Sequence, residues 1–437
     1  MKKELKLNYA RTFYIGFAFF AILLIWQLYN HYSPLYLDAL LKDKLTNEDH
    51  RWYIIGIIMA MDNLFALFML PLFGYLSDKT RTKYGKRIPY IVIGMILSIL
   101  VFPLISVAYL LSSLWGVILA MGAVLIIMNI YRSPAVALMP DVTPKPLRSK
   151  ANGIINLVGY LGAILGGGIS MIFKFTDQNK NYIVPSLIGS ALMFIALVIL
   201  IFKINENKIL EETALDMQIG EELSETTEKI EENKPLSKAD KRNLIILLVA
   251  TFLWFASFNA VETFLSVYSK NVFGDSSVAG TAVIILTFSS IIIFIPAGIL
   301  STKIGRKNTV IIGLLTIILA VVILIFQTKF NIIAIIAFAL AGIGWASINV
   351  NSYPMLVEMT HQANIGRYTG LYYTSSMAAQ SLTPIVAGAV MTFFSGPEPL
   401  FKYSTIVMVL ALLVFIFFKT PKKQLQAKKG LEAFDVE

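Results

Sequence analysis

Residues 74–90 read GYLSDKTRTKYGKRIPY and lie between two long apolar stretches. The ten positions from Asp78 to Arg87 hold five basic residues and one acid. The chain has 437 residues, of which 57% are hydrophobic and only 15% charged, whereas a soluble domain carries about a quarter charged residues. Because so few charges cannot cover a globule in water, lipid must solvate most of the chain, and the quoted stretch connects two membrane spans.

Twelve apolar segments are long enough to cross a bilayer as helices, each of which needs about 20 residues. The predicted spans are residues 12–37, 52–77, 89–111, 114–138, 151–173, 182–203, 243–268, 278–301, 308–327, 331–356, 367–394 and 400–418. We therefore expect an all-α integral membrane protein with twelve transmembrane helices.

The basic residues predict the orientation. When the connections are assigned alternately to two sides, the side that holds residues 78–88 and both termini carries 28 of the 37 Lys and Arg, and the other side carries eight. Cytoplasmic connections of membrane proteins are enriched in Lys and Arg. We expect a multi-pass protein of the cell (plasma) membrane with both termini in the cytoplasm.

A polar, Glu-rich segment, residues 205–242, separates six spans from six. Its composition predicts a solvated linker that is partly helical at best. The expected domains are an N-terminal six-helix bundle (1–204), the cytoplasmic linker (205–242), a C-terminal six-helix bundle (243–420) and a cytoplasmic tail (421–437).

The two halves repeat each other. PLFGYLSDKTRTKYGKR at 71–87 is echoed by PAGILSTKIGRK at 296–307, and ALMPDVTPKPLRSKANG at 137–153 is echoed by MLVEMTHQANIGRYTG at 355–370. Both echoes have an offset close to 220 residues. Two halves in parallel repeat are typical of carriers with a symmetry axis along the membrane normal.

These loops resemble those of the major facilitator superfamily, in which the connection between helices 2 and 3 carries Gly-x-x-x-Asp-x-x-Gly-Arg-Lys. Residues 298–307 fit that spacing except that Thr302 replaces the acid, and the first half has four extra residues before Gly85. The resemblance implies two six-helix bundles with gating loops. The predicted gating residues are Gly74, Asp78, Gly85, Lys86, Arg87, Asp141, Arg148, Gly298, Gly305, Arg306 and Arg367.

The extended first loop, together with YRSPAVALMPDVTPKPLRSKANG at 131–153 and WQLYNHYSPLYL at 26–37, resembles the sugar carriers of the glycoside-pentoside-hexuronide and sucrose-transporter branch. That resemblance implies transport of a neutral sugar. Melibiose-type sodium symporters carry two acids on helix 2, at places that Leu70 and Ala66 hold in this chain. We therefore expect H⁺, rather than sodium, as the coupling ion.

Two acids are candidates for coupling. Asp62 lies about ten residues into its span, which places it roughly 15 Å deep and near the midplane, where a charge costs several kcal/mol unless it is paired or protonated. The alternative is that Asp62 and Asn63 form a hydrogen-bonding group between helices. Glu262 lies one turn after Asn259 on the same face of its span, and its alternative is a solvated acid near the interface.

Arg132 is a basic residue well inside a predicted span. It could bind sugar hydroxyls, or it could pair with Asp78 or Asp141 as part of a gate. The sequence leaves both readings open.

A sugar is recognised by planar hydrogen-bonding groups and by rings that stack on its C–H face. Spans 1 and 10 carry such residues at helical spacing, which favours binding, although any one aromatic alone favours packing. The predicted sugar-binding residues are Trp26, Gln27, Asn30, His31, Asn63, Asn259, Trp345, Asn349, Tyr353, Tyr372 and Gln380.

Two glycines of span 5, Gly162 and Gly166, lie four residues apart and predict close helix packing.

The chain has no Cys, its three His (His31, His50, His361) have no metal-ligand spacing, and no hydrolase or nucleotide-binding motif occurs, so we expect no enzymatic activity, cofactor or metal.

Because the basic residues are spread over connections and tails, we do not expect nucleic acid as a partner. The expected partners are lipid and a small sugar, and we expect the protein to be a monomer. The alternatives to sugar symport are an exporter of drugs or metabolites by proton antiport and a non-transporting membrane sensor.

Overall fold

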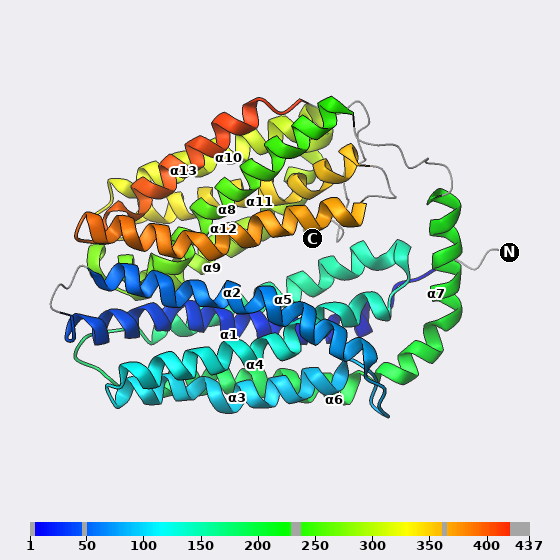
Figure 1. The fold of residues 1–437 in the computed structure, drawn as a ribbon, viewed down its shortest axis with the longest axis horizontal. Coiled ribbons are helices and arrows are strands. Elements are labelled where there is room, and N and C mark those ends of the chain that lie inside the picture. Colours follow the sequence, from blue (N-terminus) through cyan, green and yellow to red (C-terminus); the bar gives the residue numbers. More distant parts are fainter. Residues whose placement is uncertain (1–4, 46–49, 229–236, 361–364, 420–437) are drawn as a thin grey trace. The chain divides into compact units, whose positions relative to one another are not determined.

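The computed structural model describes residues 5–45, 50–228, 237–360 and 365–419, and within these ranges every regular element is helical (Figure 1). Twelve of the described helices are long and apolar enough to cross a membrane, so the predicted all-α class is confirmed. The predicted tail (421–437) and His361 lie outside the described residues.

The helices follow the predicted spans closely. The first half contains α1 (Tyr9–Lys42), α2 (His50–Lys79), α3 (Ile88–Leu110), α4 (Leu114–Asp141), the short 3₁₀ helix η1 (Lys145–Leu147), α5 (Arg148–Ile172), α6 (Ile183–Lys203) and α7 (Glu206–Glu228). The second half contains α8 (Lys238–Val272), α9 (Ser277–Ile304), α10 (Arg306–Ile325), α11 (Ile332–Met359), α12 (Ile365–Phe393) and α13 (Pro399–Ile416). Helices suit lipid because each satisfies its backbone hydrogen bonds internally.

The contacts divide the chain into two compact units, Met1–Tyr36 with Met61–Lys229 (unit 1) and Leu37–Ala60 with Ile230–Glu437 (unit 2). This division differs from the predicted domains, because the end of α1 and the start of α2 belong to unit 2. Glycines bring α2 close to α12: a Cβ on Gly56 would meet the backbone oxygen of Pro384, and a Cβ on Gly388 would meet that of Trp52.

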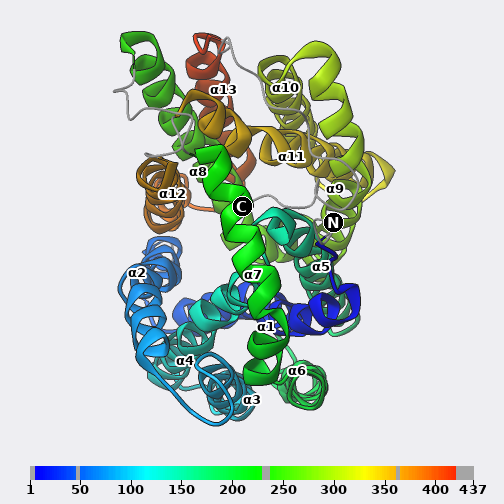
Figure 2. The ribbon, with the colours of Figure 1, turned by 90° about the vertical axis from the view of Figure 1, so that its right-hand side faces the viewer.

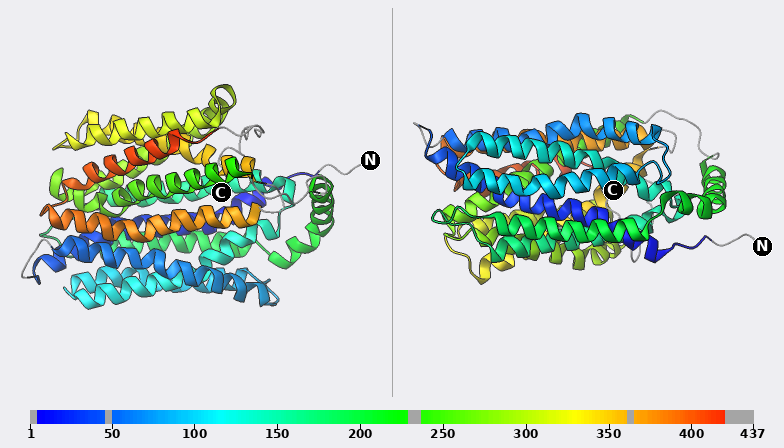
Figure 3. Two further views of the ribbon diagram at one scale, coloured as in Figure 1. Left: turned by 45° about the horizontal axis from the view of Figure 1, so that its top comes forward. Right: turned by 90° about the horizontal axis from the view of Figure 1, so that it is seen from below.

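In unit 1, α3 packs against α4 and α6, and the helices run alongside one another in the views of Figures 1 and 3. Helix α5 approaches α1 through its glycines. A Cβ on Gly162 would overlap the backbone oxygen of Phe20, and a Cβ on Gly166 would lie 2.8 Å from the Cβ of Gln27. The close packing that these glycines predict is therefore confirmed.

In unit 2, α8 packs against α12 and α13, and α11 packs against α9 and α10. Gly313 and Gly344 allow α10 and α11 to touch, since a Cβ on Gly313 would lie 2.9 Å from the backbone oxygen of Gly344. Buried hydroxyls add polar contacts: the Ser257 and Ser404 side chains share a hydrogen bond of 2.6 Å between α8 and α13. Small residues thus set the helix spacing in this unit.

The predicted linker 205–242 contains more helix than expected, and residues 229–236 lie outside the described residues. Residues 206–228 form α7, which runs across one end of the unit 1 helices (Figure 2). Glu206 is fully buried and Ile209 is 6% exposed, while a Cβ on Gly220 would lie 3.0 Å from Pro144. Although the segment is rich in Glu, one face of α7 carries small and apolar residues, and that face packs against the rest of unit 1.

Candidate gating and binding sites

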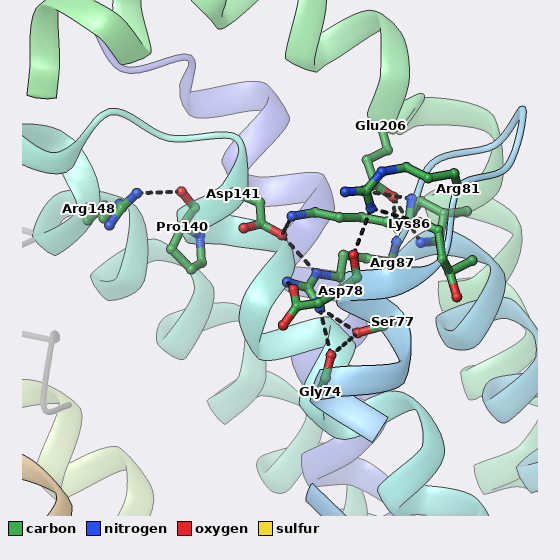
Figure 4. A network of polar contacts seen from close by, with 12 residues as sticks. Gly74, Ser77, Asp78, Arg81, Lys86, Arg87, Pro140, Asp141, Arg148 and Glu206 are labelled. Carbon is green, nitrogen blue, oxygen red and sulfur yellow. Dashed lines mark hydrogen bonds and ion pairs between the residues drawn. The ribbon is translucent and has the colours of Figure 1, made fainter. Parts of the chain in front are cut away.

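Arg87, which is 4% exposed, forms the centre of a polar network at the end of unit 1 (Figure 4). Its Nε donates to Asp141 Oδ2 at 2.8 Å, and its Nη1 donates to the Gly74 carbonyl at 3.3 Å. The same guanidinium also donates to the Ser77 hydroxyl and to the Asp78 carboxylate. One planar cation therefore ties α2, α3 and α4 together, which suits the fork geometry of Arg.

Two further predicted gating residues extend this network. Lys86 Nζ lies 3.0 Å from Asp141 Oδ2, so Asp141 has two cationic partners. Arg148, at the start of α5, donates to the backbone oxygens of Pro140 at 2.8 Å and Thr143 at 3.1 Å, which closes the turn between α4 and α5.

Glu206 is a residue that sequence reasoning missed. Its carboxylate accepts hydrogen bonds from the backbone N–H groups of Lys86 (3.0 Å), Arg87 (2.8 Å) and Ile88 (3.0 Å). These N–H groups belong to the start of α3, where a carboxylate is favoured by the positive end of the helix dipole. Gly85 adopts φ 109° beside it, and a Cβ there would collide with the Glu206 side chain.

Unit 2 contains an equivalent network. Arg306 Nε donates to Glu358 Oε1 at 2.7 Å, and its Nη1 donates to Asn351 Oδ1 at 3.3 Å. The Ser301 hydroxyl donates to the Gly298 carbonyl at 2.8 Å, as the Ser77 hydroxyl does to the Gly74 carbonyl. The sequence repeat is thus also a repeat of contacts.

The two networks differ in how deeply the acid is buried. The side chain of Glu358 is 2% exposed and that of Asp141 is 22% exposed. Glu358 was missed as a site residue although the echoed segments place an acid at both positions. Gly305, before α10, adopts φ 85°, as Gly85 adopts a positive φ before α3.

A second ion cluster that the sequence did not reveal lies inside unit 2. Asp38 Oδ1 lies 2.9 Å from Arg51 Nε and Asp38 Oδ2 lies 3.3 Å from Lys270 Nζ, while the Asp38 side chain is 3% exposed. The Arg51 guanidinium lies over the Trp52 ring at 4.2 Å from its centroid. Asp38 follows its predicted span directly, and for that reason it was assigned to a connection.

Two predicted residues of unit 1, Asp62 and Arg132, have aromatic neighbours on α1. Asp62, 5% exposed, interacts electrostatically with the buried Tyr29 on α1. The Arg132 guanidinium on α4 lies 5.2 Å from the centroid of the Trp26 ring. Arg132 thus has a predicted sugar-binding ring as a neighbour, while Asp78 and Asp141 bind Arg87.

The other predicted residues of α1 and α2 have different neighbours. Gln27 lies against Gly166 of α5, whereas its neighbour Trp26 faces α4. His31 is 2% exposed, its ring meets Tyr32 edge-on at 4.8 Å, and neither ring nitrogen has a hydrogen-bond partner among the described residues. The remaining two, which are half-buried, are Asn30 and Asn63.

In unit 2 an aromatic pair lies near the second candidate acid. Trp345 stacks on Phe258 with ring centroids 3.9 Å apart and meets Phe255 edge-on at 5.3 Å. The next residue on α8, Asn259, is 7% exposed, and its Nδ2 lies 3.5 Å from the carboxylate of Glu262. Glu262 itself is exposed, which fits its solvated alternative as well as its coupling role.

A tyrosine cluster lies between α11 and α12. The Tyr353 hydroxyl shares a hydrogen bond of 3.2 Å with Thr369, and the Tyr372 hydroxyl shares one of 2.8 Å with Ser352. These hydrogen bonds hold both tyrosine hydroxyls between the two helices.

The last three predicted residues of this half show no common site. Asn349 donates its amide to the backbone oxygen of Trp345 at 2.9 Å, within its own helix. Gln380 is half-buried, and Arg367 is exposed with its guanidinium 6.0 Å from the centroid of the Tyr368 ring. Within the described ranges there is no group of three His, Cys, Asp or Glu that could hold a metal ion.

Comparison with known proteins identifies a family. The sequence model of the Major Facilitator Superfamily matches residues 10–326 and 274–436 of this chain. An uncharacterised MFS-type transporter of Methanocaldococcus jannaschii is 25% identical over 374 residues, which cover 83% of this chain and 85% of the relative.

Solved structures share the fold. A bacterial homologue of the iron transporter ferroportin in an inward-facing state matches with a TM-score of 0.66 and 12% identity over 94% of this chain and 99% of that one. The POT family transporter PepTSo matches with a TM-score of 0.66 and 11% identity over 94% and 98%. The nucleoside transporter NupG matches with a TM-score of 0.64 and 14% identity over 93% and 99%. At such identities the likeness shows the fold alone.

Proposed function

The chain belongs to the Major Facilitator Superfamily and is a multi-pass membrane transporter, and from that premise we propose that it takes up a neutral sugar in symport with protons. The substrate is a disaccharide or another glycoside, carried by alternating access. In this proposal the protein acts as a monomer in the cell membrane, with both termini in the cytoplasm.

The observation that carries the proposal is the buried carboxylate of Asp62 in the apolar helix α2, beside Tyr29. A charge at this depth is costly, so the carboxylate is favoured in its protonated form whenever water is excluded from it. A group that gains a proton in one conformation and loses it in another can couple proton movement to that conformational change. Asp62 is therefore the first candidate for coupling, and Glu262 is the second.

Sugar recognition is supported by the rings in each unit. In unit 1, Trp26 lies beside Arg132, which offers five N–H donors. In unit 2, the Phe258 and Trp345 pair lies next to the buried amide of Asn259. Rings combined with planar donors are the chemistry that binds the C–H faces and hydroxyls of a sugar.

The main competing function is export of drugs or metabolites by proton antiport, which would use the same acid. A non-transporting sensor is less well supported. Both halves retain an intact ion network at the corresponding loop, Arg87 with Asp141 and Arg306 with Glu358, which a sensor would not need.

Reconstituted vesicles test the substrate class. We expect radiolabelled sucrose, maltose or melibiose to accumulate when a proton gradient is imposed, and Trp345→Ala to reduce that uptake at least about tenfold because stacking and ring burial are lost. Trp115→Ala is the matched control, because Trp115 is 71% exposed at the start of α4. Vesicles that expel a cationic dye and accumulate none of these sugars would contradict uptake and favour the exporter.

A further inference from the structure

Two cavities share the turn at residues 83–85, where the connection from α2 enters α3. The first has a volume of about 530 Å³ and lies between this connection and the first turns of α7. Its polar lining includes Arg81, Lys83, Lys86 and Asn207. None of the side chains that line this cavity is acidic. Its lining is therefore strongly basic.

The positive charge of this cavity is only partly neutralised. Lys86 is paired with Asp141 at 3.0 Å, and the carboxylate of Glu206, which backbone N–H groups hold nearby, adds one negative charge. Arg81 donates to the backbone oxygens of Asp78 at 2.7 Å and Thr80 at 2.9 Å, which are neutral groups.

The turn itself is held in place. Asn207 Nδ2 donates to the backbone oxygens of Thr82 at 3.1 Å and Lys83 at 3.0 Å. The backbone at Thr82 and Lys83 is therefore fixed against α7, which limits the positions that the exposed Lys83 side chain can take.

The second cavity, of about 570 Å³, lies between α3 and α6 and is mainly apolar. It is lined by Tyr84, Ile88, Pro89, Val92, Ile93, Ile201, Ile204 and Asn205. Three of these side chains face outward, since Tyr84 is 60%, Ile93 54% and Ile201 46% exposed. In a chain that spans a membrane, such a face meets lipid.

One pair of residues joins the two cavities. The Lys83 ammonium lies 5.0 Å from the centroid of the Tyr84 ring. Lys83 lines the basic cavity and Tyr84 lines the apolar cavity, so the two cavities are neighbours. Tyr and Lys side chains are typical of the headgroup level of a bilayer, and basic groups on the predicted cytoplasmic side attract anionic lipids.

We propose that the two cavities together bind one anionic phospholipid, such as phosphatidylglycerol. Its phosphate lies between Arg81 and Lys83, and an acyl chain lies in the groove between α3 and α6. The charge and the apolar groove both fit this occupant, and the proposal does not depend on the transported substrate. Because the site includes Lys86, its occupant stabilises the connection that presents Arg87 to Asp78 and Asp141.

The test is a titration of the purified full-length protein, in detergent, with phosphatidylglycerol and with phosphatidylcholine of the same acyl chains, read by native mass spectrometry. Wild type should bind phosphatidylglycerol more tightly. Arg81→Gln/Lys83→Gln should weaken that binding by about tenfold to thirtyfold, because two cations near the phosphate are lost. Ile201→Trp should weaken it as well, because the indole fills the apolar groove.

The matched control is Lys241→Gln/Arg242→Gln, which removes two exposed cations at the start of α8 that line neither cavity. It should leave phosphatidylglycerol binding within about twofold of wild type. Equal losses in the two double variants would overturn the proposal in favour of general charge attraction. Full displacement by glycerol 3-phosphate, with no effect of Ile201→Trp, would overturn it in favour of a free-anion site.

Discussion

At the scale of single residues, each half of the chain contains an arginine–carboxylate pair, and the two pairs differ in how deeply they are buried. Arg306 and Glu358 form a pair whose side chains are 8% and 2% exposed, whereas Asp141, the partner of Arg87, is 22% exposed and also binds Lys86. Removal of one partner from a buried pair leaves a charge without compensation, and that cost grows with burial.

Arg306→Ala should therefore lower the free energy of unfolding by about 3–5 kcal/mol, because Glu358 would stay buried without its cation. Arg87→Ala should cost less, because Asp141 keeps Lys86 and contact with water. Denaturant titrations of both variants in the same detergent provide the comparison. An Arg306→Met/Glu358→Gln double variant that is no more stable than Arg306→Ala would contradict the role given to the unpaired carboxylate.

At this scale the sequence predicted the arginines and glycines of both loops, and the acids Asp78 and Asp141, but not which side chains meet. Glu358 and Asp141 lie in echoed segments, yet an echo does not say which side chains meet. Glu206 and Asp38 lie in segments that composition assigned to a linker and a connection, and only the folded backbone brings them to the start of α3 and to Lys270.

At the scale of helices, apolar length predicted where the spans lie but not where each helix ends. Helix α8 begins at Lys238, before the predicted residue 243, because Ser237 accepts a hydrogen bond from the backbone N–H of Asp240 and caps it. Capping and polar end turns lie outside the lipid, so a search for apolar runs does not find them.

The glycines of α5 yield a prediction about packing. Gly162→Leu should prevent α5 from approaching α1, because even a Cβ would overlap the backbone oxygen of Phe20. Gly168→Leu is the matched control in the same helix, because nothing lies within 4 Å of a Cβ built there. Size-exclusion chromatography of the detergent extract should show aggregate or loss of protein for the first variant and a monodisperse peak for the second. Similar profiles would show that the close approach is not needed.

The docking of α7 yields another prediction. Glu206→Ala should expose the backbone N–H groups of Lys86, Arg87 and Ile88, at a cost of about 1–2 kcal/mol for the lost helix cap. Hydrogen exchange should then accelerate at the start of α3, while Glu211→Ala, which removes an exposed acid from the same helix, should leave it unchanged. Equal exchange in both variants would show that Glu206 does not hold this connection.

At the scale of the whole molecule, the orientation rests on the positive-inside rule alone. A chain without Cys allows a direct test. Gln178→Cys, in the connection between α5 and α6, should react in intact cells with a membrane-impermeant thiol reagent, and Lys83→Cys should react only after the membrane is opened. The reverse pattern would place both termini outside.

The central claim is that Asp62 couples proton movement to sugar uptake, and one measurement addresses it directly. Asp62→Asn removes the titrating group but keeps a polar side chain of similar size on α2. In proteoliposomes with an imposed proton gradient, the variant should no longer accumulate sugar, yet it should still exchange labelled for unlabelled sugar across the membrane, because exchange requires no net proton movement. Sugar accumulation by Asp62→Asn at the wild-type level, or wild-type uptake that follows a sodium gradient at constant pH, would contradict the account.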